Sequence, residues 1–348
     1  MTISPTSVPD FDDLPKVEGM PQGCSWGIFD TNGKKDLHGT LNFLTPEIVA
    51  AAAKEVTHGV SISLNWPLNA SAKLSMTPRK QPEHKVLYIP QDFPGLEDLK
   101  PGEGKSWDDE ISFNTQISSQ WDSFCHYQHQ HTGLAYNGFN PSRNSLAKDA
   151  LEKNPMPTLE HWHERGGLVG RGILLDYKGY CDDTNKSFDP MGGSSISIDD
   201  LEACATHFGV EFRPGDVLLV RTGYTEAVDT LTANGTTDRA SGKSSGLENS
   251  VQVARWLWNK RFAAVASDAV ALETMPPKKA DGSVGFLQDL VLHPYMLSCF
   301  GMPIGEMWDL KELARYCRDK QRYSFMITSV PLNMPGLIGS PPNAMAIF

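Results

Sequence analysis

The sequence predicts a mixed α/β protein, because runs typical of buried strands alternate with helical segments along most of the chain. No internal repeat and no linker divides it. Three short aliphatic runs are the clearest strand signals, since short apolar runs bounded by turn residues are typical of buried strands. These strands are expected at 172–176, 217–220 and 262–268, and helices are expected at 199–204 and 248–260.

The proline-rich stretch at 1–22 is expected to be an extended arm, and residues 23–348 a single α/β domain. The arm either lies over the body of its own chain or reaches a neighbouring subunit. It has neither the apolar centre of a secretory signal nor the arginine-rich character of a transit peptide. No apolar run approaches the length of a membrane span, so we expect a cytoplasmic protein with no membrane partner.

The first regular elements are expected soon after the arm. Thr45 followed by Pro46 is typical of a helix start, since Thr caps the helix and Pro fits its first turn. An alanine-rich run follows, and Gly59 ends it. Residues 60–64 alternate between apolar and polar, as a half-buried strand does. Six prolines between 66 and 105 predict an elaborated loop or a small subdomain without long regular elements.

The later elements follow the same mixed order. We expect a short helical run at 161–163, which the glycine pair at 166–167 ends. A stretch rich in Thr, Gly and Ser at 229–246 predicts a surface loop. A helix with alternating charges is expected near 309–319, and a last strand at 324–330.

The composition narrows the range of partners. Of 348 residues, 40% are apolar and 21% are charged, which is typical of a globular protein with a large core. The formal net charge is -11 and no basic cluster is present, so nucleic acid is not expected as a partner. Six cysteines are scattered without a CxxC pair, which argues against a disulfide framework or a zinc knuckle. A small-molecule substrate is the expected partner.

A polar segment in the middle of the chain is the first candidate for chemistry. Its polar residues recur at every second position, which places them on one face of an extended chain. Amides, a carboxylate and an imidazole are costly to bury together without a ligand or a metal. The alternative is a polar sheet face with surface histidines. The segment contains Gln116, Ser118, Gln120, Asp122 and His126, and His129 and His131 follow it.

A second candidate lies far downstream. His293 is followed by Pro294, and thirteen residues after the histidine comes Glu306, preceded by the frame Gly-Met-Pro-Ile-Gly. That frame is typical of a backbone bend, which would present Glu306 at a fixed angle. The alternative for Glu306 is an ordinary acid at the start of a helix.

These separated motifs resemble the metal-dependent cyclase family, which includes kynurenine formamidase-like and isatin hydrolase-like enzymes. The first family motif reads His-x-Gly-Thr-His-x-Asp-x-x-x-His, where two His and the Asp bind metal and the last His lies beside the metal-bound water. A His and a Glu far downstream complete that centre. In this chain the matching positions hold Gln116, Ser118, Ser119, Gln120, Asp122 and His126, then His293 and Glu306. Residues 215–223 also resemble the family's central strand, and the resemblance spans roughly residues 40 to 330.

The resemblance implies a swivelling β/β/α fold, with mixed sheet layers wrapped by helices and the first motif on inner strands. It also implies a homo-oligomer, most simply a homodimer. Among the site residues it assigns a metal-binding role to Asp122, His293 and Glu306, and a proton-carrying role to His126.

The two glutamines depart from the family motif. Gln116 and Gln120 replace both first-motif histidines, and amide oxygen is a poor ligand for Zn. The retained set of Asp122, His293 and Glu306 therefore implies one divalent ion, with Mn and Mg as candidates beside Zn and with Gln120 or Gln116 as a neutral oxygen ligand. A metal-free centre is the alternative, in which Asp122 and Glu306 act with His126 as acid and base.

Three functional hypotheses follow. The first is a hydrolase of a cyclic or aryl amide or a lactone, in which His126 takes a proton from water and returns it to the leaving group. The second is a non-hydrolytic acid–base enzyme of secondary metabolism, such as a dehydratase, cyclase or isomerase. The third is a non-catalytic small-molecule binding protein. Substrate-binding residues are expected to be Gln116, Gln120, Trp121, Tyr127 and Tyr136, with ordinary core packing as the alternative for the three aromatic residues.

Overall fold

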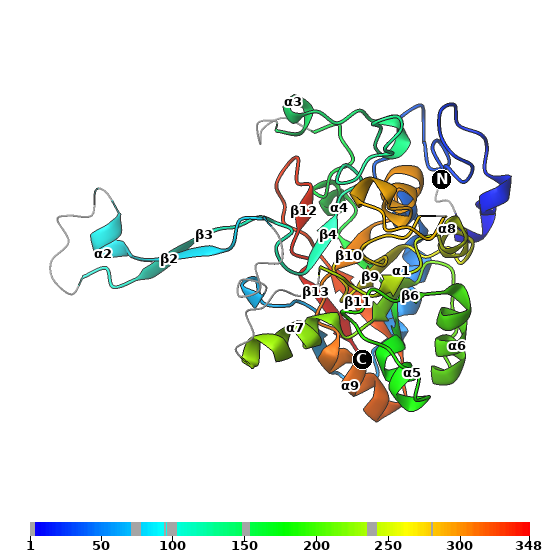
Figure 1. Ribbon diagram of the computed structural model, residues 1–348. Coiled ribbons are helices and arrows are strands. Elements are labelled where there is room, and N and C mark those ends of the chain that lie inside the picture. The colour runs from blue at the N-terminus through cyan, green and yellow to red at the C-terminus, as the bar shows by residue number, and fades with distance from the viewer. Residues whose placement is uncertain are drawn as a thin grey trace.

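A nine-stranded mixed sheet forms the centre of the protein, and helices surround it (Figure 1). The computed structural model describes residues 4–70, 78–93, 95, 103–147, 154–234, 242–279 and 281–348. The strand order is β1-β13-β11-β5-β7-β9-β10-β4-β12. These strands are β1 (Ser61–Ser63), β4 (Gln120–Asp122), β5 (Leu168–Asp176), β7 (Val217–Arg221), β9 (Ala264–Ser267), β10 (Ile304–Glu306), β11 (Ser324–Ser329), β12 (Gly339–Ser340) and β13 (Ala344–Ile347).

Two smaller sheets, nine α-helices and several short 3₁₀-helices accompany the main sheet in the described residues. The small sheets pair β2 (Glu83–Tyr88) with β3 (Trp107–Ser112), and β6 (Ser195–Ile196) with β8 (Gly246–Leu247). The helices are α1 (Pro46–Ala52), α2 (Ile89–Asp92), α3 (Arg143–Leu146), α4 (His161–Glu164), α5 (Tyr177–Asp183), α6 (Ile198–Phe208), α7 (Tyr224–Ala233), α8 (Val251–Asn259) and α9 (Lys311–Lys320). The architecture confirms the α/β class, with a mixed sheet layer wrapped by helices.

The middle of the sheet is parallel and buried. β5, β7, β9 and β10 run parallel to one another, whereas the outer strands pair antiparallel. The three aliphatic runs predicted as strands form β5, β7 and β9, as expected for strands covered on both faces. β5 begins at Leu168, earlier than predicted, and both Gly170 and Gly172 lie inside it. Side chains of Leu44 and Phe325 occupy the space that a Cβ would fill at these two glycines.

Local capping explains where the main helices begin. The Thr45 side chain accepts a hydrogen bond from the backbone N–H of Ile48, and Pro46 occupies the first turn of α1, as predicted. At the start of α6, Ser197 and Asp200 form a reciprocal capping box. These contacts satisfy backbone N–H groups that a helix start otherwise leaves without partners.

The strand that carries the first polar motif is shorter than its alternating pattern predicted. Only Gln120–Asp122 form β4, and residues 115–119 follow turns and bends. Asn114 causes the turn, since its side-chain oxygen accepts from the backbone N–H of Gln116 at 2.9 Å. Ser118 donates to the carbonyl of Pro67 at 2.9 Å. The expectation that residues 116 and 118 share one face of an extended strand is therefore wrong.

The proline-rich region after residue 66 contains a long hairpin that the sequence did not predict. β2 and β3 pair antiparallel over six positions, and Figure 1 shows them extending away from the body. The prolines lie outside the two strands, since Pro82 precedes β2 and Pro90 lies in α2, between β2 and β3. The part of the predicted loop at 71–77, 94 and 96–102 lies outside the described residues.

The N-terminal arm lies over the body of its own chain. It contains two short 3₁₀ turns, Pro5–Ser7 and Phe11–Asp13, so it is less extended than predicted. Arg261 donates to the carbonyl oxygens of Pro5 and Val8 at 3.2 and 2.7 Å. Phe11 is buried in the main core. These contacts favour the first of the two arrangements considered for the arm.

Two further expectations need correction near the ends of loops. In the expected surface loop at 229–246, residues 229–233 complete α7 and residues 246–247 form β8. Residues 235–241 of that loop lie outside the described chain. Strands β12 and β13 were not predicted, because they are short and prolines 341 and 342 lie between them.

Within the described residues, no helix combines the length and the apolar character that a membrane span requires.

We predict that Gly39→Ala destabilises the protein far more than Gly59→Ala does. Both residues have a positive φ, 54° and 69°, so each alanine bears a left-handed backbone cost of about 1–2 kcal/mol. Only at Gly39 would the added Cβ meet a backbone atom, the carbonyl oxygen of Gly301 at 1.9 Å. Overpacking there adds about 1–3 kcal/mol. Denaturant unfolding of both variants measures the difference, and equal losses would contradict the prediction.

Candidate functional site

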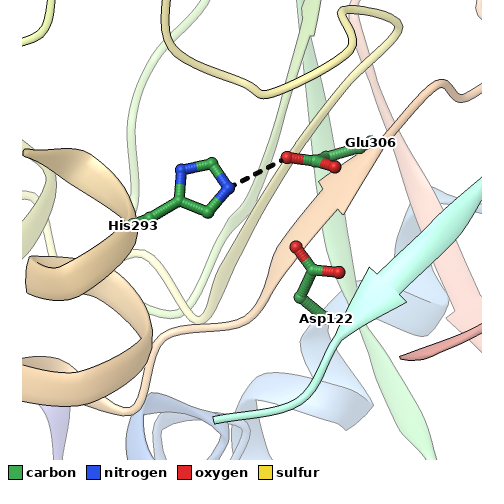
Figure 2. Close-up of side chains that lie close together, drawn as sticks. All are labelled: Asp122, His293 and Glu306. Atoms are coloured by element: carbon green, nitrogen blue, oxygen red, sulfur yellow. Dashed lines mark hydrogen bonds and ion pairs between the residues drawn. The ribbon is translucent and has the colours of Figure 1, made fainter. Parts of the chain in front are cut away.

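Asp122, His293 and Glu306 converge on one buried point (Figure 2). Asp122 lies on β4 and Glu306 on the adjacent antiparallel strand β10, where the register pairs Glu306 with Gln120. Because Gln120 and Asp122 are two positions apart, both project from the same face of β4. His293 directly precedes the helical segment at 294–300. Their ligand atoms lie within 4.8 Å of one another, and all three side chains are buried.

Glu306 ends a strand and does not begin a helix. It is the last residue of β10, and Gly301 bends the chain before the strand with a φ of 61°. Gly301 therefore provides the predicted bend, whereas Ile304 and Gly305 already belong to the strand. The alternative of a helix-start acid is excluded, because α9 begins only at Lys311.

Glu273 holds His293 in position, and sequence reasoning missed it. Its fully buried carboxylate accepts from the backbone N–H groups of Val291, Leu292 and His293 at 3.0, 3.1 and 2.9 Å. It also lies 2.8 Å from Nδ1 of His293. This contact directs the other ring nitrogen, Nε2, toward Glu306 at 3.2 Å. The available signal was a single acid inside the otherwise uncharged run at 269–275.

Both glutamines point their amide nitrogens at the carboxylates. Nε2 of Gln116 donates to Oδ1 of Asp122 at 2.6 Å. Nε2 of Gln120 donates to Oε2 of Glu306 at 2.7 Å and lies 3.3 Å from Oδ1 of Asp122. The amide oxygen of Gln120 is buried and has no hydrogen-bond partner among the described residues, so its expected role as an oxygen ligand of a metal stays a prediction.

His126 lies beside the three converging residues. Nε2 of Gln116 is 3.0 Å from Nδ1 of His126, so one amide group contacts both the imidazole and Asp122. Burial lowers the pKa of His126. The neighbouring Asp122 acts in the opposite direction, whereas His293 lowers the pKa further. His126 is therefore a neutral imidazole near pH 7, which is the form that can accept a proton.

The electrostatics of the other two groups are coupled. Burial by itself lowers the pKa of His293, but hydrogen bonds with Glu273 and Glu306 outweigh it and raise this pKa to about 10. Burial and the neighbouring Asp122 raise the pKa of Glu306, while His293 opposes that change. Two acids close together in a buried place cannot both ionise easily, so they require a compensating positive charge.

Of the three aromatic residues predicted to bind substrate, only Tyr127 lies at the site. Its ring is half-buried and its centroid lies 5.4 Å from that of His293. Trp121 is fully buried and contacts Trp308, because it alternates to the opposite face of β4. Tyr136 is also fully buried, and its hydroxyl donates to Asp36 at 3.0 Å. Trp121 and Tyr136 are therefore core residues, which corrects their predicted role.

The nearby cysteine and histidines take no part in this arrangement. Cys125 is buried with its sulfur 4.0 Å from the carbonyl of Pro157, and burial raises its pKa to about 12. A thiol of this kind is not a nucleophile at neutral pH. Nδ1 of His129 contacts the hydroxyl of Thr132 at 3.0 Å, and His131 is exposed.

The residues fit one divalent cation. Oδ2 of Asp122 is buried and has no hydrogen-bond partner within the part of the chain that the structure describes, as expected for an oxygen that a cation would satisfy. Asp122, His293 and Glu306 offer two carboxylate oxygens and one imidazole nitrogen. The contact of Glu273 with Nδ1 of His293 is the outer interaction that orients metal-binding histidines in proteins. Bound metal would replace the proton on Nε2, so affinity should increase with pH.

Comparisons with known proteins agree on the fold. The Cyclase family model matches residues 44–274. A crystal structure described as a novel cyclase superposes with a TM-score of 0.75 and 28% identity, covering 93% of this chain and 99% of that chain. Isatin hydrolase A from Ralstonia solanacearum has a TM-score of 0.52 and 13% identity, covering 86% and 95%.

A further solved structure is similar in the same way. An isatin hydrolase bound to the product analogue thioisatinate superposes with a TM-score of 0.52 and 12% identity, covering 84% of this chain and 93% of that chain. No curated protein sequence matches the chain. At these identities the two isatin hydrolases support the fold alone, and the fold expected from the sequence motifs is confirmed.

We predict that Glu273→Gln weakens binding of Mn²⁺ by about 10–100-fold, because loss of the carboxylate frees the orientation of His293. Glu248→Gln is the matched control, since it removes the same charge from a side chain outside the three converging residues. Isothermal titration with Mn²⁺ measures the affinity, and thermal melting shows whether each variant is folded. Equal affinities for the folded Glu273→Gln variant and the control would disprove the role of Glu273.

Proposed function

Because the chain belongs to the cyclase family, whose model matches residues 44–274, we propose that it is a hydrolase of a cyclic or aryl amide or of a lactone. The observation that carries this proposal is the buried convergence of Asp122, His293 and Glu306 beside the neutral imidazole of His126. Buried groups of this kind, with shifted pKa values, are typical of functional sites.

In this proposal Asp122, His293 and Glu306 hold one divalent ion, Mn, Mg or Zn. Such an ion, when bound, supplies a Lewis acid for the scissile carbonyl and lowers the pKa of a water molecule. Glu273 keeps Nε2 of His293 pointed at the other two groups. Gln116 and Gln120 donate to the carboxylates and so reduce the repulsion between them.

His126 moves the proton in the proposed reaction. Its neutral imidazole accepts a proton from the attacking water and then donates one to the leaving nitrogen or oxygen. Gln116 fixes the ring through its contact with Nδ1. Tyr127 offers an aromatic surface next to His293, which suits a planar cyclic or aryl substrate.

The orientation of the glutamines favours a second candidate function. Where the family motif has two histidines, this chain aims two neutral N–H donors at Asp122 and Glu306. The raised pKa of Glu306 lets it hold a proton closer to neutral pH than an ordinary carboxyl. Two carboxyl groups and His126 could then serve acid–base chemistry without hydrolysis, such as dehydration, cyclisation or isomerisation.

We predict that solvent oxygen enters the product. The purified protein, with and without added Mn²⁺, is incubated in ¹⁸O-labelled water with a panel of cyclic amides and lactones. Isatin is included because solved relatives of this fold are isatin hydrolases. Mass spectrometry should find one ¹⁸O atom in the product of hydrolysis. Turnover without ¹⁸O would favour the acid–base candidate, and binding without turnover of any panel member would favour a binding protein.

We predict that His126→Ala lowers turnover by about 10²–10⁴-fold, because a positioned proton carrier contributes that much. His129→Ala is the matched control, since His129 contacts Thr132 and lies outside the converging residues. The turnover number is measured for both variants with the substrate found above. Unchanged turnover in His126→Ala would remove His126 from the reaction.

A further inference from the structure

Arg79 is a positively charged side chain beside the acidic candidate site. Its Nη1 donates to the backbone carbonyl of Gln116 at 2.6 Å. The next residue holds the same segment in place, because the carbonyl of Lys80 accepts from the backbone N–H of Asn114 at 3.2 Å. The side chain of Gln116 in turn donates to Asp122. One residue therefore connects the guanidinium of Arg79 to the converging acids.

The charge of Arg79 acts on both sides of the site. Burial is the largest influence on two neighbouring groups, since it lowers the pKa of His126 and raises the pKa of Glu306. The positive charge of Arg79 adds to the first change and opposes the second. Charge interactions weaken with distance and are screened over about 10 Å in salt solution. The guanidinium therefore lies near both the proposed proton carrier and the proposed metal ligand.

Three side chains near the buried acids are partly exposed to solvent, namely Arg79, His126 and Tyr127. They supply a cation, a proton acceptor and an aromatic ring. The acids themselves, Asp122 and Glu306, are buried. A ligand that approaches from solvent can therefore contact the three partly exposed side chains before it reaches the acids.

An arginine in this place suits a carboxylate. A guanidinium binds a carboxylate through two parallel N–H donors, and such a charge-assisted contact is stronger than one between neutral groups. Hydrolysis of a cyclic amide or lactone adds the hydroxyl of water to the carbonyl carbon and its remaining hydrogen to the leaving nitrogen or oxygen. The acid that forms is ionised near pH 7. Asp122 and Glu306 alone would repel this anion, whereas a cation beside them favours its binding.

We propose that Arg79 binds a carboxylate of the ligand while Tyr127 packs against the adjacent ring. For its reaction this inference rests on the proposed function, and it narrows the substrate class. The carboxylate either belongs to the substrate or is the one that hydrolysis forms. The neighbouring Lys80 takes no part, since its ammonium contacts the hydroxyl of Ser112 at 2.8 Å and the carboxylate of Glu83 at 2.9 Å.

Isothermal titration with benzoate and benzamide tests this subsite without turnover. The natural protein should bind benzoate more tightly than benzamide, because only benzoate is charged. Arg79→Gln should weaken benzoate binding by about tenfold or more and leave benzamide binding unchanged. Arg79→Lys should lose less affinity, since it keeps the charge without the planar pair of donors. Lys80→Gln is the matched control and should bind both ligands as the natural protein does.

Thermal melting shows whether each variant is folded, and the titrations are repeated after chelation of metal. Absence of benzoate binding, or equal benzoate affinity in the natural protein and Arg79→Gln, would overturn the proposal. So would an affinity that disappears on chelation but is insensitive to Arg79→Gln, since benzoate would then be bound by metal alone. These titrations involve no hydrolysis, so they can support the subsite even if the ¹⁸O experiment contradicts the proposed function.

Kinetics with the substrate found in the ¹⁸O experiment identify the source of the carboxylate. If the substrate carries it, Arg79→Gln should raise KM by about tenfold. If hydrolysis forms it, KM should stay unchanged while the inhibition constant of the product rises by about the same factor. A variant in which neither constant changes would show that Arg79 does not bind a carboxylate during the reaction.

Discussion

Two carboxylates buried next to one another are the constraint on which the rest of the site depends. Asp122 and Glu306 come from paired strands, and their mutual repulsion in a place without solvent must be compensated. The compensation comes from His293, which is itself held by the buried carboxylate of Glu273. The two glutamines complete it with N–H donors. Each of these groups contacts one of the two acids or the residue that does, and removal of one partner would leave a buried charge uncompensated.

The central strands and the three converging residues could both be predicted from the sequence, but on different grounds. Short aliphatic runs are unambiguous where both faces of a strand are covered, which is the case for β5, β7 and β9. Asp122, His293 and Glu306 were found through motif spacing, which fixes residue types but no orientation. The orientation of the Gln120 amide group could therefore not be predicted from the sequence. It depends on the positions of two other side chains, those of Asp122 and Glu306.

Two other wrong predictions concern the two-residue alternation of side chains along a strand. Alternation was extended to residue 116, although Asn114 turns the chain there. The same alternation should have placed Trp121 away from the site, since it lies between Gln120 and Asp122 on a strand. Glu273 could not be recognised from spacing, because its partners are backbone N–H groups about twenty residues downstream. The hairpin was not predicted because prolines lie before it and in the connection between its strands.

The position of β4 in the sheet has a consequence for biosynthesis. Both of its neighbours, β10 and β12, come from the last part of the chain, and Gln120 and Glu306 are 186 residues apart. The N-terminal part of a chain is synthesised first. The segment around residue 120 is therefore solvent-exposed and unpaired until the residues of β10 and β12 have been synthesised. The candidate centre is therefore among the last parts of the protein to assemble. A chain that ended before residue 304 would lack both β10 and β12, the two strands with which β4 pairs.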